Sequence, residues 1–296
     1  LGVIGDWENP YLTLNREFEA STVKALEKIY NNGHLKKGFK PVNWCVKIQS
    51  ALAEAEVEYK EKESTAIDVK FKITSSSSLE NIFGIKNLST ETFIVIWTTT
   101  PWTLPSNTAL TVGRNIDYIV VRTFNQYTFK PIRVLIAKDL LQKQFGKNYE
   151  ASEIIENFIP GSKKIPYQVE LELKGFELLE IRYEQLWFES PQPIENAQNA
   201  FRIIEGEFVT TEEGTGIVHT APTFGADDAK VAKEASPQVP PLLILDENNN
   251  KVPLVDLQGR FRKEVGVLGG RFVKNEYYPE GTAPERSTDV EIDNVD

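Results

Sequence analysis

The N-terminal part of the chain contains one pattern with a helical period and one with a strand period. Apolar residues recur with a helical period from Phe18 to Tyr30, and Asn31-Asn32-Gly33 follows as a typical helix end. We therefore predict one amphipathic helix there. Between Ala53 and Tyr59, small or apolar residues alternate with glutamates, which is typical of a strand with one face in water. We predict a strand over residues 53–59.

Strand patterns dominate the middle of the chain. One stretch alternates apolar with charged side chains, and three later runs are apolar or β-branched: Val69 to Ile73, then Phe93 to Trp97, Asp117 to Thr123 and Ile132 to Ala137. The run from Phe93 to Trp97 is apolar throughout, so we expect it to be buried on both faces. Lys138 to Phe145 predicts a short helix.

Turn signals divide the second half of the chain into short segments. Phe208 to His219 predicts a hairpin around Glu212-Glu213-Gly214, and Leu242 to Val255 predicts another around Asp246 to Asn250. Many short strands with turns between them predict a β-barrel or a sandwich.

The composition, with 41% hydrophobic and 26% charged residues in 296, is that of a water-soluble globular protein. No apolar run is long enough to span a bilayer, and the lone Cys45 excludes an internal disulfide, so we expect a cytoplasmic protein. The chain starts at Leu1 and contains no methionine, so we expect a piece excised from a longer protein or an engineered one. The serines at 75–78 predict a surface loop, and the acidic stretch 282–296 is expected to be exposed or extended.

Few residues are available for conventional catalysis. Of the two histidines, His34 follows a helix end and is expected to be structural, whereas His219 ends the strand-like GTGIVHTAP and precedes Asp228. A structural role is an equally good interpretation of His219. The glycines Gly214 and Gly216 would permit close backbone approach. The chain has no Gly-x-Ser-x-Gly elbow, no His-Glu-x-x-His, no paired cysteines, no Walker loop and no dinucleotide fingerprint. We therefore expect no metal and no cofactor.

A threonine-rich stretch, IWTTTPWTLPSNTAL, runs from Ile96 to Leu110. Pro101 and Pro105 forbid regular structure there, so its hydroxyls lie where a core strand ends. Because threonine favours strands and Thr-Pro favours turns, a purely structural interpretation is open. If this turn and the turn after His219 face one pocket, that pocket offers hydroxyls, backbone donors, an imidazole and a carboxylate. Such a set suits a small ligand with an ammonium group, together with an oriented water molecule.

Four motifs, in order, resemble the editing domain, called connective peptide 1, of isoleucyl-tRNA synthetases, and the resemblance covers nearly the whole chain. They are GDWENPYLT from Gly5, ALAEAEVEY from Ala51, WTTTPWTLPSN from Trp97 and EEGTGIVHTAP from Glu212. The related valyl and leucyl domains carry Thr-Thr-Arg-Pro where this chain has Thr99-Thr100-Pro101-Trp102, and they lack a histidine at the position of His219. The isoleucyl branch is therefore indicated.

This resemblance implies an α+β, β-rich fold: a closed β-barrel core of the Val/Ile/Leu-tRNA synthetase editing-domain type, decorated with helices. Residues 1–52 would form a helical connective segment leading from the synthetase core, and residues 53–296 the editing domain. The editing domain would include a helical insertion near 138–160 and an extended C-terminal return segment. We expect a monomer when the chain is isolated.

The resemblance also implies a reaction, the hydrolysis of mischarged valyl-tRNA(Ile) at the aminoacyl ester, with isoleucyl-tRNA(Ile) rejected by pocket shape. Asp228 would bind the α-ammonium group, and Thr100 and His219 would form the wall that excludes isoleucine. The residues that would bind the ribose hydroxyls, the ester or the attacking water are Thr98, Thr99, Thr103 and Asn107, and the substrate-binding set also includes Trp97, Thr220 and Phe224. No metal or covalent nucleophile is required.

The implied partners are the 3′ end of tRNA(Ile) carrying valine and the rest of the parent synthetase, with no membrane. A net charge of −10 argues against a freestanding nucleic-acid binder, which fits a domain whose parent makes most tRNA contacts. Lysines that either touch phosphates or are merely solvated are Lys36, Lys37, Lys40, Lys163 and Lys164. Two other interpretations stay open: a non-catalytic aminoacyl-adenosine- or tRNA-binding module that needs the parent synthetase for activity, and a purely structural insert.

Overall fold

A computed structural model describes residues 2, 4–36, 41–61, 63–74, 84, 91–179, 181–187 and 190–283. The chain forms two compact units, Leu1–Lys40 and Pro41–Asp296. The predicted domain boundary between residues 52 and 53 differs from this division and stays a prediction. The serine loop at 75–78, nearly all of the C-terminal stretch, Lys37 and Lys40 lie outside the described residues. No helix in the described part of the chain is long and apolar enough to cross a membrane.

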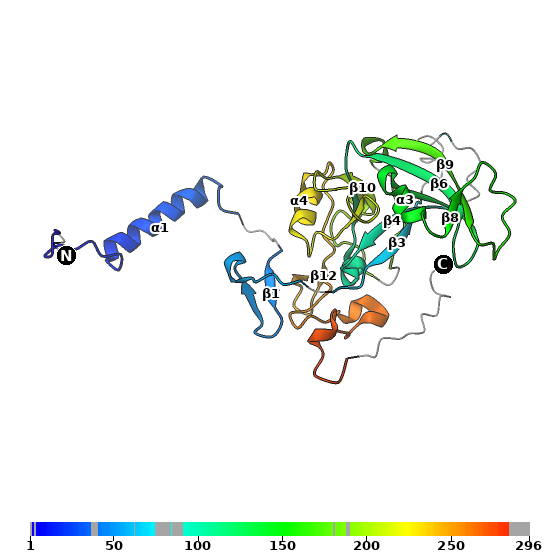
Figure 1. Cartoon of the computed structure of the whole chain (residues 1–296). Coiled ribbons are helices and arrows are strands. Elements are labelled where there is room, and N and C mark those ends of the chain that lie inside the picture. Colours follow the sequence, from blue (N-terminus) through cyan, green and yellow to red (C-terminus); the bar gives the residue numbers. More distant parts are fainter. Residues whose placement is uncertain are drawn as a thin grey trace. The chain divides into compact units, whose positions relative to one another are not determined.

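The first unit contains helix α1, Arg16–Asn31 (Figure 1). Asn15 caps its first turn by accepting a hydrogen bond from the Glu17 N–H at 3.0 Å, and Lys28 in the last turn complements the helix dipole. The predicted helix is thereby confirmed. None of its residues is buried, so its apolar side chains, such as Leu26, face solvent in this unit.

The second unit is built on a six-stranded sheet in the order β3-β4-β7-β6-β9-β8. The strands are β3 Ile67–Lys72, β4 Thr92–Thr98, β6 Asp117–Phe124, β7 Pro131–Ala137, β8 Tyr149–Ala151 and β9 Ile165–Lys174 (Figure 1). The β4–β7 and β8–β9 pairs are parallel, and the other neighbours are antiparallel. The strands predicted around Val69, Phe93, Asp117 and Ile132 are therefore confirmed.

A three-stranded sheet, β10-β5-β11, lies next to the six-stranded sheet and contains His219 in β11. Its strands are β5 Ala109–Val112, β10 Arg202–Glu205 and β11 Ile217–Thr220, and two small sheets are formed by β1 Asn43–Cys45 with β2 Ser50–Leu52 and by β12 Ile244–Leu245 with β13 Lys251–Val252. The β12–β13 pair confirms the hairpin predicted between Leu242 and Val255. The α+β, β-rich class is confirmed, but neither large sheet closes on itself among the described residues, so the closed barrel stays a prediction.

Short helices connect these strands. They are α3 Leu141–Phe145, α4 Ala226–Glu234 and the 3₁₀ turns η1 Glu54–Glu56, η2 Pro101–Ser106, η3 Lys138–Leu140, η4 Gly175–Leu178, η5 Ala197–Asn199, η6 Lys263–Leu268 and η7 Asn275–Tyr277. Together η3 and α3 confirm the short helix predicted at 138–145. The insertion expected near 138–160 is helical only in this first part, because β8 follows.

One predicted strand and one predicted hairpin are wrong. Residues 53–59 hold the turn η1 instead, because the Glu56 carboxylate reaches back to accept the Ala53 N–H at 2.8 Å and closes a helical turn. The predicted hairpin from Phe208 to His219 is also absent from the structure. Its second half, β11, pairs with the distant strand β5, and no strand is assigned between residues 206 and 216.

The main core lies between the two larger sheets. Successive side chains of β6 point to opposite faces, so Tyr118 and Val120 pack in this core while Ile119 and Val121 pack in a second cluster on the other face, which Phe145 of α3 joins. This explains why the central strands read as continuous apolar runs. As predicted for β4, it carries buried residues on both faces, for example Phe93 and Ile94.

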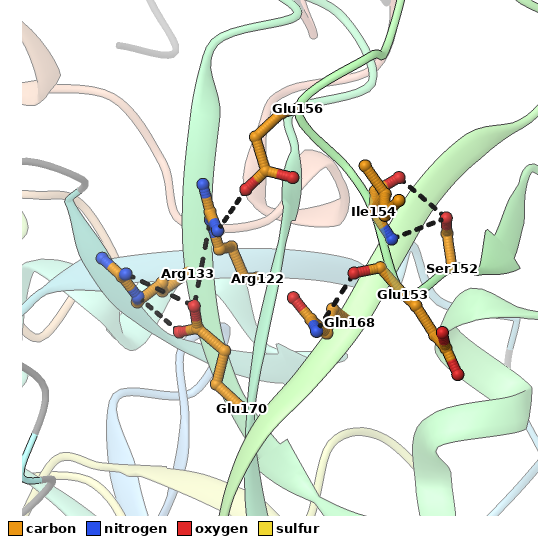
Figure 2. Close-up of polar contacts among 8 residues, drawn as sticks. All are labelled: Arg122, Arg133, Ser152, Glu153, Ile154, Glu156, Gln168 and Glu170. Atoms are coloured by element: carbon orange, nitrogen blue, oxygen red, sulfur yellow. Dashed lines mark hydrogen bonds and ion pairs between the residues drawn. The ribbon is translucent and has the colours of Figure 1, made fainter.

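Charged residues form ion pairs near one end of the six-stranded sheet. Arg133 Nε lies 2.6 Å from Glu170 Oε2, and Arg122 Nη1 lies 2.9 Å from Glu156 Oε1 (Figure 2). The Arg133 side chain is only 7% exposed, so its pairing with Glu170 is largely desolvated. We refer to these four residues as the ion-pair end. It lies near the Phe124↔Pro131 end of the β6–β7 pair, whereas the candidate site lies at the opposite, Tyr118↔Ala137 end.

Candidate functional site

The threonine-rich turn begins where β4 ends. Thr98 is the last residue of β4, and its hydroxyl oxygen accepts the Thr100 N–H at 3.0 Å. Thr100 then occupies the N-cap position of η2 without a capping bond from its side chain, and Pro101 takes the first helical position, where the missing N–H has no cost. The Thr103 hydroxyl donates to the Thr100 carbonyl at 2.9 Å. Thr99 and Thr100 are exposed, whereas Thr103 is buried, so this turn presents hydroxyls on both sides.

Strand pairing brings the second motif to this turn. In the β5–β11 pair, His219 lies opposite Leu110 and Thr220 opposite Ala109, and the Thr108 N–H donates to the Thr220 carbonyl at 3.1 Å. The Thr220 hydroxyl is 2.6 Å from that of Thr111 and is fully buried, so it serves this strand pair and does not face a cavity.

His219 joins the two motifs directly. Its Nε2 lies 3.0 Å from the Thr103 hydroxyl and its Nδ1 lies 2.8 Å from the Asn107 side-chain nitrogen. The Asn107 amide also donates to the Ala109 carbonyl at 2.8 Å. Burial lowers the pKa of His219 from its ordinary 6.5 to about 4, so the ring is neutral at physiological pH. Both ring nitrogens are used within the protein, which makes His219 a rigid part of the site.

Asp228 lies on helix α4, shortly after β11. Its Oδ2 accepts the Ala221 N–H at 2.8 Å, which fixes the start of α4 against the end of the strand. Burial raises the pKa of Asp228, the Ala221 hydrogen bond partly offsets this, and the neighbouring Asp227 raises it further. A cation beside this carboxylate would therefore be favoured, because it would compensate the cost of burying the charge.

An aromatic contact also links the two motifs. The Trp102 and Phe224 rings meet edge to face with their centroids 5.0 Å apart. Trp102 packs at the same time against the cluster that contains Leu242 and Leu254. Phe224 thus serves to hold the threonine-rich turn against the segment that leads to α4.

A cavity of about 400 Å³ lies beside the threonine-rich turn. Among the predicted site residues, it is lined by Trp97, Thr98 and Thr99, and the second motif contributes residues 212–218. Thr100, Thr103, Asn107, His219, Thr220, Phe224 and Asp228 do not line this cavity. The structure therefore brings the two motifs together, while it places the hydroxyls of Thr98 and Thr99 in a different compartment from the His219 network.

Two glycines allow this close approach, as the sequence predicted. Gly214 and Gly216 have φ of 71° and 74°, in the left-handed region that favours glycine. A Cβ on Gly216 would lie 2.3 Å from Ala137 Cβ, and one on Gly214 would lie 3.1 Å from Trp97 Cβ. A side chain at Gly216 would push the second motif away from the sheet, and one at Gly214 would crowd Trp97.

Three residues that position the site were missed in the sequence. Tyr118 donates its hydroxyl to the Gly216 carbonyl at 2.7 Å, and Gln144 of α3 donates to the Gly214 carbonyl at 3.1 Å. Tyr183 donates to Asn107 Oδ1 at 2.6 Å. These contacts join distant segments, and the local sequence carries no signal that could have found them.

The remaining predictions concern metals and phosphates. Within the described residues, no three His, Cys, Asp or Glu side chains are grouped so as to hold a metal ion. His34 and Lys36 are exposed in the first unit. In the second unit Lys163 is exposed, and Lys164 donates to the Lys147 carbonyl at 2.5 Å.

Comparison with known proteins identifies isoleucine–tRNA ligases among the relatives of this chain. Isoleucine–tRNA ligase of Cytophaga hutchinsonii is 40% identical over 284 residues, which cover 94% of this chain and 24% of that protein. The Porphyromonas gingivalis enzyme is 38% identical over 314 residues, covering 99% and 26%, and that of Francisella tularensis subsp. tularensis is 43% identical over 234 residues, covering 79% and 22%. The chain thus spans about a quarter of the length of these relatives.

Solved structures with partial likeness include the editing domain of the P. knowlesi cytosolic leucyl-tRNA synthetase, with a TM-score of 0.41 and 11% identity over 62% of this chain and 67% of that chain. A second is GlLeuRS-CP1, with a TM-score of 0.40 and 15% identity over 57% and 58%. The family model described as tRNA synthetases class I (I, L, M and V) matches residues 1–219, well over half of the chain. The chain therefore belongs to the class I tRNA synthetases (I, L, M and V).

Proposed function

We propose that this chain hydrolyses the ester bond of valyl-tRNA(Ile) and leaves isoleucyl-tRNA(Ile) intact. The observation that carries the proposal is the direct contact between the two motifs, in which His219 is hydrogen-bonded to Thr103 and Asn107 beside a cavity lined by Thr98 and Thr99. The relatives named above are isoleucine–tRNA ligases. Valine is smaller than isoleucine by one methylene, a difference that binding alone discriminates only weakly.

The reaction needs little more than an oriented water molecule. Water attacks the ester carbonyl carbon, the bond to the ribose oxygen breaks, and valine and a tRNA with a free 3′-terminal hydroxyl are released. Because an aminoacyl ester is already activated, positioning of water and stabilisation of the oxyanion are sufficient. The hydroxyls of Thr98 and Thr99 and the glycine-rich backbone at 214–216 line the same cavity and would supply these donors.

Selectivity would come from shape. A buried methylene contributes only about 0.8 kcal/mol, so attraction alone separates valine from isoleucine weakly, whereas a wall that cannot yield excludes the larger side chain. The contacts of His219 with Thr103 and Asn107, and of Thr103 with the Thr100 carbonyl, would make such a wall stiff. None of these residues lines the 400 Å³ cavity, so the aminoacyl side chain would have to extend beyond that cavity to meet the wall. With both ring nitrogens engaged, His219 would act in this wall and not as a general base.

Asp228 would anchor the α-ammonium group of the amino acid. Its Oδ2 is used by the Ala221 N–H, and within the described chain Oδ1 has no partner, so it would accept from the ammonium group. Charge-assisted hydrogen bonds of this kind are roughly twice as strong as neutral ones. The carboxylate lies outside the lining of the 400 Å³ cavity, so this anchor is the step that most needs a test.

The test is single-turnover deacylation of valyl-tRNA(Ile) and isoleucyl-tRNA(Ile) by the unmodified chain, Asp228→Ala and Asp227→Ala. We expect valine-selective hydrolysis, a loss of about tenfold to a hundredfold in Asp228→Ala, and a much smaller change in Asp227→Ala, since that neighbouring aspartate is exposed. Cleavage of neither ester would overturn the proposal. Binding of a non-hydrolysable valyl-adenosine analogue would then separate a binding module from a structural insert.

The partners follow from the same proposal. They are the valine-bearing 3′ end of tRNA(Ile) and the remainder of a longer synthetase, since the chain spans about a quarter of its relatives. With a net charge of −10, the isolated chain is expected to bind tRNA weakly and to be a monomer. Its expected compartment is the cytoplasm, where translation enzymes meet tRNA.

A further inference from the structure

Tyr183 lies behind both motifs and is only 2% exposed. Its backbone is fixed by a bridge to Ile73 and by an N–H bond to the Phe201 carbonyl at 3.1 Å. Its ring meets Phe71 edge to face with the centroids 5.2 Å apart. The hydroxyl therefore has a fixed position, and from there it donates to Asn107 Oδ1 at 2.6 Å.

The hydrogen bonds that start at Tyr183 can run in one direction only. The Asn107 side-chain nitrogen contacts the Ala109 carbonyl oxygen, an obligatory acceptor, so this atom is the donating NH₂ group. Because an amide nitrogen only donates, His219 Nδ1 must accept from it, and the ring proton must sit on Nε2. The Nε2–H then donates to the Thr103 hydroxyl oxygen. The Thr103 O–H in turn donates to the Thr100 carbonyl.

We propose that Tyr183 is a positioning residue, which through Asn107 fixes the Nε2–H tautomer and the orientation of the His219 ring. By the same chain it holds Thr103 and the Thr100 carbonyl in place. That these groups meet the aminoacyl side chain rests on the proposed function, whereas the control of the ring by Tyr183 does not.

The chemistry of the buried amide explains why the tyrosine hydroxyl matters. Asn107 is 2% exposed, so without Tyr183 its Oδ1 would be a buried acceptor with no donor. We expect the Asn107 amide to move until Oδ1 finds another hydrogen-bond donor. This movement would break its bond to His219 Nδ1, and the ring would then populate both tautomers. Burial raises the pKa of the Tyr183 hydroxyl well above 10.0, so this group stays protonated and remains a donor.

The chain is well suited to a direct test, because it contains only two histidines. Nitrogen-15 NMR of the imidazole rings distinguishes the two neutral tautomers, and His34→Gln assigns the signals. In the unmodified chain we expect His219 to be entirely the Nε2–H form. In Tyr183→Phe we expect signals averaged between the two forms, while Tyr167→Phe, a buried tyrosine of the opposite core cluster, serves as the matched control and leaves the signals unchanged.

A kinetic readout accompanies the spectroscopic one. Tyr183→Phe should lower the ratio of valyl to isoleucyl ester hydrolysis about tenfold, the effect of one lost buried hydrogen bond, and Tyr167→Phe should not change it. An Nδ1–H tautomer in the unmodified chain, or unchanged His219 signals in Tyr183→Phe, would overturn the inference. Since the tautomer is measured without catalysis, a chain that cleaves neither ester defeats the proposed function and leaves the NMR result to decide the role of Tyr183.

Discussion

The two ends of the six-stranded sheet are held by different kinds of polar contact. At the ion-pair end, Arg133 and Glu170 form a close charged pair with little exposure. At the site end, two buried contacts are neutral: the Tyr118 hydroxyl binds Gly216, and Tyr183 starts the chain through Asn107. The Asp228 carboxylate, which accepts the Ala221 N–H, is the charged group beside them. A neutral network has no ion that an arriving charged substrate could attract, so it keeps its geometry. The ion pair stabilises its end of the sheet, and the neutral network keeps the shape of the site.

The largest effect is expected at the ion-pair end. Glu170→Met would remove the carboxylate that pairs with the buried Arg133 guanidinium, which costs about 3–5 kcal/mol of the free energy of unfolding, whereas the hydrolysis of valyl-tRNA(Ile) by the folded fraction should be little changed. Urea unfolding measures the first quantity and single-turnover kinetics the second. A stability loss no larger than that of Glu172→Met, which removes an exposed ion pair with Lys138, would contradict the idea that the Arg133–Glu170 pair is desolvated.

The second effect concerns the protonation of His219. Because its folded pKa of about 4 lies below the ordinary 6.5, the unfolded chain binds the proton first as the pH falls. The stabilisation is therefore complete above pH 6.5 and is lost between pH 6.5 and about 4, by about 3 kcal/mol in all.

Urea unfolding at pH 7 and at pH 4.5 measures this loss. Carboxylates titrate in the same range, so the unmodified chain is compared with His219→Gln, which should show a smaller drop in stability. His34→Gln is the control, because that histidine is exposed and should leave the drop unchanged. Equal drops in all three chains would mean that His219 is not buried as a neutral ring.

A smaller effect on stability is expected from a side chain at Gly216, and comparison with Gly270 separates backbone strain from steric crowding. Gly216 and Gly270 both have positive φ, of 74° and 80°, but only a Cβ at Gly216 would meet another atom, Ala137 Cβ at 2.3 Å. Gly216→Ala should therefore destabilise the protein by about 1–3 kcal/mol more than Gly270→Ala. Thermal or urea unfolding of the two variants gives this difference directly, and equal losses would show that the second motif does not pack closely on β7.

The smallest effect is expected from an exposed charged pair on the same strand as Glu170. Lys138 and Glu172 lie 2.5 Å apart, but both side chains are about half exposed. Solvent and salt screen such a pair, so Glu172→Met should change the free energy of unfolding far less than Glu170→Met, and salt should remove the remainder. A loss as large as that of Glu170→Met would erase the distinction between buried and exposed charges on β9.

Patterns of apolar and polar residues correctly predicted helix α1 and the central strands. The central strands followed their apolar positions because their faces pack in a core, whereas helix α1 followed its helical period although none of its residues is buried. The alternation at 53–59 gave a wrong strand prediction. The Glu56 carboxylate caps a helical turn there and does not lie on the solvent-exposed face of a strand. The hairpin at 208–219 failed for another reason: β11 takes its partner from β5, and no local pattern shows a distant partner.

The site was predictable in its chemistry but not in its assembly. The threonine-rich turn and His219 are recognisable in the sequence as polar groups at strand ends, but no sequence pattern shows that they meet. Tyr183 gave no signal, because its hydroxyl meets Asn107, 76 positions away in the chain. A tyrosine becomes a positioning residue only through the packing that buries it.

The pairing of β5 with β11 has a consequence for the order of folding. It places the hydroxyls of Thr111 and Thr220 in contact although they are 109 positions apart. Closing so long a loop is slow compared with forming local structure. During synthesis, β3 to β9 leave the ribosome before β11 exists, so the large sheet can assemble while the site is still incomplete. A nascent chain that ends before β11 therefore has the scaffold without the site.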